Sequence, residues 1–155
     1  MKIGMIICSY SGHTLTVAEK IKTALLHKGN EVTLVKLAAS NEDPKSKEPV
    51  RLLSIPDLNT YDVVIFGAPV IGGQLAPVMR EYLTHLSPLH AKKAGCFITQ
   101  HFPWKWMGAS SSVQKITKAA EQGGASVLAT GIVQWSSKMR EDQINQLAED
   151  MCNLS

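Results

Sequence analysis

The segment 3–17 is the feature that most constrains the fold of this chain. An apolar run ends at Cys8, and a helix pattern with Val17 and Ile21 on one face starts a few residues later. The polar turn 9–14, Ser-Tyr-Ser-Gly-His-Thr, joins the two. A strand that passes directly into a helix leaves backbone N–H groups unpaired where the helix begins, and the helix dipole favours negative charge there. The segment therefore predicts an anion-binding site.

Composition is typical of an ordinary globular protein. Of the 155 residues, 45% are hydrophobic and 19% are charged, which suits one domain spanning 1–155 with a sizeable core. The apolar runs are too short to span a membrane, and the start of the chain does not look like a signal peptide. The cysteines, Cys8, Cys96 and Cys152, are far apart and form no metal-ligand spacing. We expect a cytoplasmic protein without a disulfide, a zinc site or a membrane anchor.

The net charge of +3 does not indicate nucleic-acid binding. Basic residues are scattered along the chain, and those between 42 and 51 alternate with carboxylates. Nucleic-acid-binding domains usually gather their Lys and Arg on one face. We therefore expect no nucleic-acid partner.

Apolar runs and helix patterns alternate along the chain. The expected strands are 2–8, 31–36, 63–67, 94–99 and 126–133. The expected helices are 14–28, 77–86, 109–121 and 138–151. The proline-containing segment 37–60 is irregular and has room for at most a short helix near 50–54.

This alternation predicts an α/β fold with three layers, in which helices cover both faces of a mostly parallel sheet. A doubly wound, five-stranded sheet in the order 2-1-3-4-5 fits best. Such folds bind ligands beyond the carboxyl ends of the strands, where the strand order reverses. The loops 9–14, 68–75 and 100–108 leave those ends and are unusual in composition.

Two motifs resemble the flavodoxin family. The turn Ser9-Tyr10-Ser11-Gly12-His13-Thr14 is similar to the family's phosphate-binding loop, Thr/Ser-x-Thr/Ser-Gly-x-Thr. The segment 61–73 resembles its third strand and first flavin loop, and the order of elements agrees over essentially the whole chain. The uninterrupted fifth strand is similar to that of the short-chain subgroup. The resemblance implies a flavodoxin-like fold that binds FMN non-covalently.

The turn 9–14 would have to hold the FMN phosphate with neutral donors, because residues 3–19 contain no Lys or Arg. A hydrogen bond to a charged group is worth about 1.5–3 kcal/mol, so several together can anchor a phosphate. The alternative is that Ser9, Ser11 and Thr14 only cap the helix. His13 contributes either its backbone N–H alone or an imidazolium beside the phosphate.

The resemblance places the loop 68–75 against the isoalloxazine ring of FMN. Its expected contacts are Pro69, Val70, Ile71, Gly72 and Gly73. Many relatives carry a Trp where this chain has Ile71, so the contact here would be aliphatic. A glycine at position 72 would let a peptide flip and donate to the reduced flavin, and the alternative is an ordinary flexible turn.

The loop 100–108 is rich in aromatic residues, with Phe102, Trp104 and Trp106 close together and Pro103 expected to stiffen them. The resemblance implies that one aromatic, Phe102 or Trp104 above all, stacks on the flavin. The alternative is a contact with another protein, including a homodimer contact. Further expected cofactor contacts are His101 and the backbone of Thr99 and Gln100. His101 is also a candidate proton donor to a substrate, and the alternative is that it is incidental.

Two functions fit an FMN protein of this kind. The first is electron transfer, with a redox partner protein or a small-molecule electron acceptor. The alternative is an FMN-dependent NAD(P)H or quinone reductase. Electron-carrying flavodoxins are usually acidic, whereas this chain is basic and its loops 68–75 and 100–108 contain no carboxylate. The reductase alternative lacks a recognisable nicotinamide-binding motif. A signalling receiver domain is excluded, because its acidic residues are missing after the first and third strands. A Rossmann domain is disfavoured, because Gly-x-Gly-x-x-Gly is absent after the first strand.

Overall fold

The structure is a computed structural model, and it describes residues 1–102 and 104–155. The strands are β1 Lys2–Ile7, β2 Glu31–Lys36, β3 Val63–Ile71, β4 Gln74–Leu75, β5 Lys93–Gln100 and β6 Ser126–Gln134. The helices are α1 His13–His27, α2 Pro77–Thr84, α3 Ala109–Gln122 and α4 Arg140–Cys152. No helix in the described ranges is long and apolar enough to cross a membrane.

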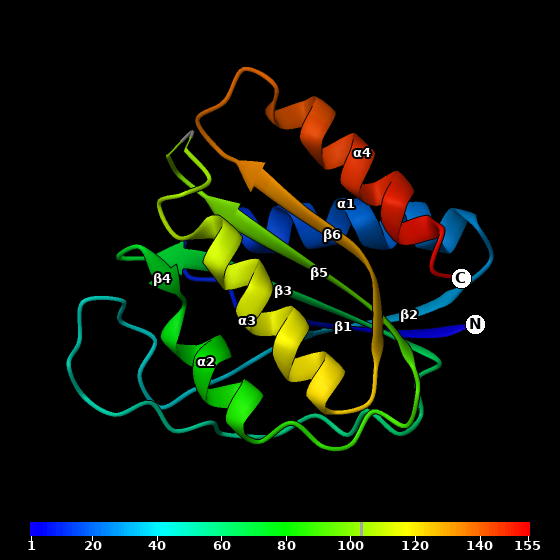
Figure 1. The fold of residues 1–155 in the computed structure, drawn as a ribbon, viewed down its shortest axis with the longest axis horizontal. Helices are drawn as coiled ribbons and strands as arrows, with labels where there is room; N and C mark the ends of the chain where they lie inside the picture. The colour runs from blue at the N-terminus through cyan, green and yellow to red at the C-terminus, as the bar shows by residue number, and fades with distance from the viewer. Residues whose placement is uncertain (103) are drawn as a thin grey trace.

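The predicted α/β fold is confirmed. Parallel strands run in the order β2-β1-β3-β5-β6, which is the doubly wound order 2-1-3-4-5 when the parallel strands alone are numbered. The short β4 pairs antiparallel with β3 and lies off this path. In Figure 1, α3 passes in front of the sheet whereas α1 lies behind it, so helices cover both faces.

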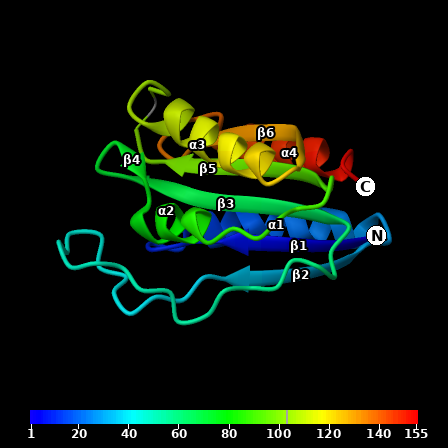
Figure 2. The ribbon, with the colours of Figure 1, turned by 60° about the horizontal axis from the view of Figure 1, so that its bottom comes forward.

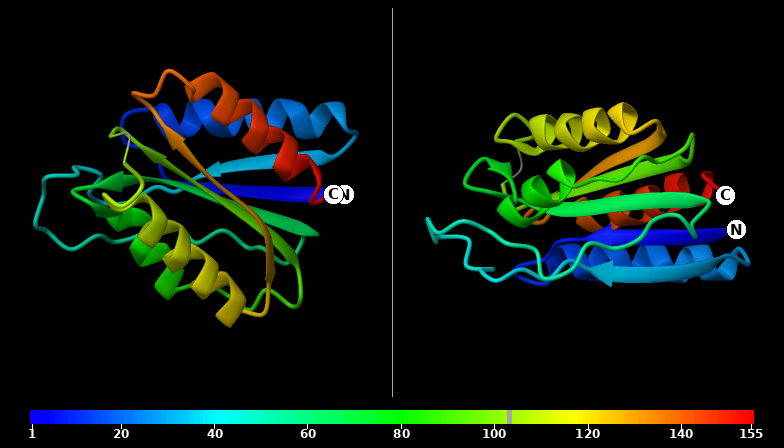
Figure 3. Two further views of the ribbon diagram at one scale, coloured as in Figure 1. Left: turned by 45° about the horizontal axis from the view of Figure 1, so that its top comes forward. Right: turned by 90° about the horizontal axis from the view of Figure 1, so that it is seen from below.

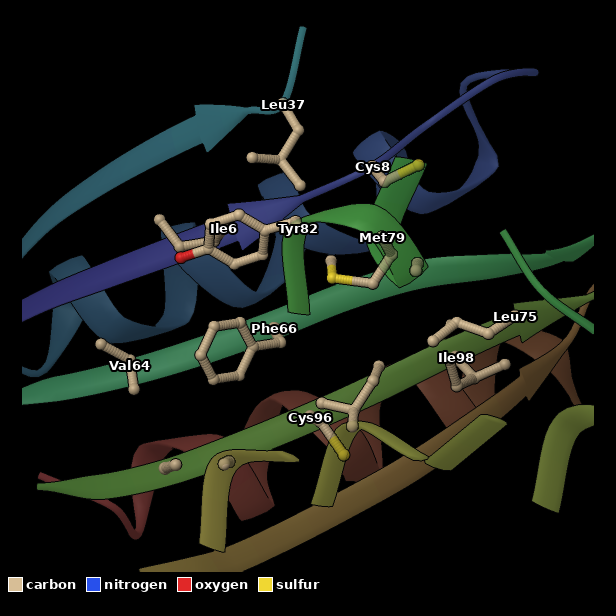
Figure 4. Close-up of a cluster of buried hydrophobic side chains, with 14 of the residues drawn as sticks. Ile6, Cys8, Leu37, Val64, Phe66, Leu75, Met79, Tyr82, Cys96 and Ile98 are labelled. Carbon is tan, nitrogen blue, oxygen red and sulfur yellow. The ribbon is translucent and has the colours of Figure 1, made fainter. Parts of the chain in front are cut away.

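Side chains alternate between two cores, one on each face of the sheet. Along β1, Met5 and Ile7 face the core beneath α1 and α4, whereas Ile6 faces the core beneath α2 and α3. Figure 4 shows this second core, where Tyr82 of α2 packs near Phe66 of β3. These rings are essentially inaccessible to solvent, as the apolar pattern of the central strands predicts.

The prediction that 68–75 is a loop is wrong, because β3 continues beyond Gly67 to Ile71. Val70 and Ile71 pair with Leu75 and Gln74, which form β4. Gly72 and Gly73 connect the two strands with positive φ angles of 59° and 76°. A two-residue hairpin turn that matches the twist of its strands needs such angles, and glycine adopts them without strain.

The segment 37–60 contains no helix, so the short helix allowed near 50–54 does not form. Prolines at 44, 49 and 56 remove backbone donors and disfavour helix in the residues before them. The segment is instead fixed by an antiparallel bridge between Ala39 and Leu52 and by burial of Leu37 and Leu58. Figure 2 shows it as a long irregular connection from β2 to β3.

Two helices are shorter than predicted at one end. α2 ends at Thr84 rather than at 86, since His85 and Leu86 donate to carbonyls three residues back and tighten the last turn. α4 begins at Arg140 rather than at 138. A turn precedes it, in which the backbone N–H of Met139 donates to the Ser137 hydroxyl at 3.0 Å.

The sheet has two functionally different ends. The two termini lie side by side at one end (Figure 3). The connections that leave the carboxyl ends of β1, β3, β5 and β6 gather at the other end (Figure 1). Ligands of doubly wound sheets bind at the carboxyl end, so this end is the expected place for a ligand site.

We predict that Gly67→Ala destabilises the fold by about 1–3 kcal/mol, because an added Cβ would overlap the buried ring of Phe97. The free energy of unfolding in urea measures the cost. Phe97→Leu removes the far end of the ring, so the double variant should be more stable than the sum of the two single costs implies. Strictly additive costs would show that the ring is not the cause.

Candidate functional site

The turn 9–14 sits at the carboxyl end of the central strand β1. The backbone N–H of Cys8, the residue after β1, donates to the carbonyl of Gly67 in β3 at 2.9 Å. Gly12 then adopts φ 90° and begins α1, and its carbonyl accepts from the backbone N–H of Thr16 at 2.9 Å. A side chain at this φ would be strained, so glycine is what allows the strand to turn directly into the helix.

The backbone N–H groups of residues 9–14 have no acceptor among the described residues. The next N–H, of Leu15, donates weakly to the Ser9 hydroxyl at 3.3 Å. The first turn of α1 contains no acidic side chain to offset the positive end of the helix dipole. Donors without an acceptor among the described residues and an uncompensated dipole at one point suit this turn to an anion.

The hydroxyl groups of the turn have different surroundings. The buried Thr14 hydroxyl lies 2.8 Å from the hydroxyl of Thr99 at the end of β5, so the structure brings these two expected site residues together. Ser11 is exposed. Tyr10 instead faces α2, where its hydroxyl accepts from the Val78 N–H at 3.4 Å. Burial raises the pKa of Tyr10 to about 12.

The β3–β4 hairpin and the loop 101–108 lie against each other. A Cβ at Gly108 would overlap the Gly73 carbonyl, so the two backbones meet at a point where only glycine fits. The buried Gln100 amide donates to the carbonyls of Trp104 at 2.9 Å and Met107 at 3.4 Å, which fixes the loop to the end of β5. Its own Oε1 is buried without a partner among the described residues.

The aromatic side chains of this loop are available to a ligand or a partner. Phe102 is 50% exposed, Trp104 54% and Trp106 78%. Trp104 and Trp106 stack with ring centroids 6.2 Å apart, and exposed His101 meets Phe102 edge to face at 5.4 Å. Pro103, which was expected to stiffen the loop, lies outside the described residues. Pro69, Val70 and Ile71 are half-buried at the end of β3.

Sequence reasoning missed a fourth part of this edge, the connection from β6 to α4. Trp135 follows β6 directly, and its indole stacks on the His13 ring with centroids 3.9 Å apart and an angle of 11°. The Arg140 guanidinium carbon lies 4.5 Å from the centroid of the same indole. The sequence did contain a signal for this residue, because Trp135 is the first residue after the fifth parallel strand and therefore lies at the carboxyl end of the sheet.

Other chemistries find little support at this edge. No group of three or more metal-ligating side chains occurs in the described part of the chain. Burial raises the pKa of the Cys8 thiol to about 12 and that of Cys96 to about 11, so both are protonated core residues rather than reactive thiolates. The segments 68–76 and 100–112 contain no carboxylate, and Lys105 is exposed. The edge is therefore suited to binding an anion and an aromatic group.

We predict that His13 makes the protein less stable in acid. Burial, then Arg140 and His101, hold the pKa of His13 below its usual value, whereas the unfolded chain takes up this proton near pH 6.5, its approximate ordinary value. The free energy of unfolding should therefore fall as the pH drops from 7 to 5, and the His13→Asn variant should lose less of it over this range. Urea unfolding of both proteins measures the difference between their free energies of unfolding. Between pH 7 and 8, the control range, this difference should stay constant. Equal slopes between pH 7 and 5 would contradict the assignment.

Comparisons with known proteins establish the fold. No model of a protein family and no curated protein matches this chain. Among solved structures, flavodoxin 2 from Bacillus cereus is 19% identical with a TM-score of 0.71, covering 99% of each chain. Two-electron reduced Megasphaera elsdenii flavodoxin is 22% identical with a TM-score of 0.67, covering 97% of this chain and 98% of that one. A short-chain flavodoxin associated with a bacterial microcompartment is 15% identical with a TM-score of 0.72, covering 99% and 97%. The chain thus has the flavodoxin-like fold over its whole length.

Proposed function

We propose that this chain binds FMN non-covalently and acts in electron transfer. The observation that carries the proposal is the row of backbone N–H groups in the turn 9–14 that have no acceptor among the described residues. This turn lies where the strand order reverses in a flavodoxin-like sheet. Flavodoxins are also among the solved structures that match nearly the whole chain. At low identity they support the fold, and the cofactor is our inference from the site.

The donor set fits the phosphate of FMN. The free N–H groups of 9–14 suit an anion, and the exposed hydroxyl of Ser11 adds a donor beside them. A side-chain carboxylate is absent from the turn and from the first turn of α1. Free donors at the positive end of a helix hold a phosphate without a salt bridge inside the turn.

The hairpin and the aromatic loop fit a flat ring. Val70 and Ile71 offer aliphatic surface, and Phe102 and Trp104 expose aromatic surface on the neighbouring loop. The exposed backbone N–H groups of Gly72 and Gly73 have no acceptor among the described residues, so the hairpin turn can donate to polar atoms of the ring. When bound, FMN supplies the isoalloxazine that accepts and releases electrons.

The charge of the two segments that would surround the ring affects how readily a bound flavin accepts electrons. Segments 68–76 and 100–112 carry Lys105 and no carboxylate. Such surroundings favour additional negative charge on a bound ring, whereas nearby carboxylates would oppose it. We propose that electrons leave through the exposed aromatic loop, either to a redox partner protein that covers it or to a small-molecule acceptor.

A direct experiment compares the affinities of the protein for FMN and riboflavin, followed by quenching of flavin fluorescence. Ser11→Ala removes a phosphate donor, so we predict an FMN affinity about tenfold lower with riboflavin affinity unchanged. Ser126→Ala, at the opposite end of the sheet, is the control and should leave both unchanged. If the unaltered protein bound riboflavin as tightly as FMN, the turn 9–14 would be only a helix cap.

A reductase that uses NAD(P)H is the second candidate. The exposed aromatic residues and the carboxylate-free loops would also suit an uncharged ring substrate such as a quinone. NADH or NADPH added without oxygen to the FMN-loaded protein separates the two functions. We predict slow loss of the visible flavin absorbance and no acceleration of turnover by an added quinone. Rapid bleaching and quinone-dependent turnover would establish the reductase instead.

A further inference from the structure

Trp135, in the connection between β6 and α4, contacts two basic side chains near the turn 9–14, which contains no Lys or Arg of its own. His13 belongs to the turn, and its ring lies parallel to the Trp135 indole at 3.9 Å. Arg140 lies over the same indole, with its guanidinium carbon 4.5 Å from the ring centroid. Both basic groups are thus held by one aromatic ring at the N-terminal end of α1.

The backbone fixes Trp135 between two elements. Its N–H donates to the Gln100 carbonyl at the end of β5 at 2.7 Å. Its carbonyl accepts from Arg140 Nη1 at 2.9 Å. Arg140 therefore contacts both the ring and the carbonyl of Trp135, which restricts where its charge can lie. A planar guanidinium suits this combination of stacking and hydrogen bonding, and an ammonium does not reproduce it.

The charge of Arg140 is only weakly compensated. Its Nε lies 3.8 Å from a carboxylate oxygen of Glu141, but the other oxygen of that carboxylate is 2.7 Å from the ammonium of Lys20. Lys20 is also the main cause of the lowered pKa of Glu141. One carboxylate thus faces two cations, and the excess positive charge lies near the positive end of the α1 dipole.

A cation at the positive end of a helix is unfavourable unless an anion is also present. Burial, then the charges of Arg140 and His101, lower the pKa of His13, so the charge of Arg140 acts on a residue of the turn. The turn 9–14 offers neutral donors to an anion, and Arg140 offers the positive charge that the turn lacks. These two contributions are complementary, since hydrogen bonds act at contact and charge acts through space.

We propose that Arg140, held in place by Trp135, determines the preference of this site for the phosphorylated flavin. The inference rests on the proposed binding of FMN and adds a positioning role for residues outside the turn. Arg140 stabilises a phosphate dianion in the turn electrostatically. Trp135 keeps the guanidinium and the His13 ring beside the turn.

The test measures dissociation constants of FMN and riboflavin for Arg140→Gln, Arg140→Lys and the unaltered protein. Arg140→Gln should weaken FMN about tenfold at low salt and leave riboflavin unchanged, because riboflavin has no phosphate. Arg140→Lys keeps the charge and should recover part of the loss. The difference should shrink at high ionic strength, since salt screens a through-space interaction.

Two further variants separate this role from general charge and from folding. Lys138→Gln removes the same charge from an exposed position in the same connection and should change FMN affinity much less. Trp135→Ala should weaken FMN as Arg140→Gln does, whereas Trp135→Phe keeps a ring and should retain most of the affinity. Unchanged riboflavin affinity in each variant shows that the site remains folded.

The outcomes distinguish this inference from the function on which it rests. If the unaltered protein binds no FMN, the proposed function fails and the role of Arg140 fails with it. If FMN binds but Arg140→Gln leaves its affinity unchanged, the inference alone is overturned. An equal loss for FMN and riboflavin, or an equal loss in Lys138→Gln, would also overturn it, because either result removes the specific link between Arg140 and the phosphate.

Discussion

The left-handed conformation of Gly12 is the constraint on which the proposed site depends. It lets the central strand β1 turn directly into α1, and the intervening N–H groups have no acceptor among the described residues. The buried hydrogen bond between Thr14 and Thr99 then ties the start of the helix to β5. Because β1 lies between β2 and β3, this turn opens at the point where the strand order reverses.

The remaining parts of the site are fixed to this turn by contacts between loops. Gly108 packs on Gly73, so the aromatic loop and the hairpin act as one wall. Gln100 fixes that loop through its side-chain amide and holds Trp135 through its backbone carbonyl. Trp135 in turn stacks on His13, which belongs to the turn 9–14, so this contact connects the loop to the turn. Four segments that are far apart in sequence thus form one edge of the molecule.

Much of the fold could be predicted from the sequence, because the central strands are continuous apolar runs and the helices end at clear signals such as Gly29 and Gly123. The hairpin was missed although Gly72-Gly73 directly follows the apolar residues Val70 and Ile71, since the predicted strand 63–67 already ended at a glycine. The stack of His13 and Trp135 joins residues at opposite ends of the chain, and no local pattern reports such a contact. The irregular segment 37–60 is fixed by tertiary burial of Leu37 and Leu58 rather than by its own pattern.

The most direct test of the account observes the backbone N–H groups of the turn themselves. Amide resonances of ¹⁵N-labelled protein would be followed by NMR during titration with FMN and, separately, with riboflavin. FMN should shift the amide protons of residues 9–14 downfield in a saturable manner, as expected when they donate to a phosphate. Riboflavin should shift amides of the hairpin and the aromatic loop but leave those of 9–14 near their original positions. Saturating FMN that leaves the amides of 9–14 unshifted would contradict the account.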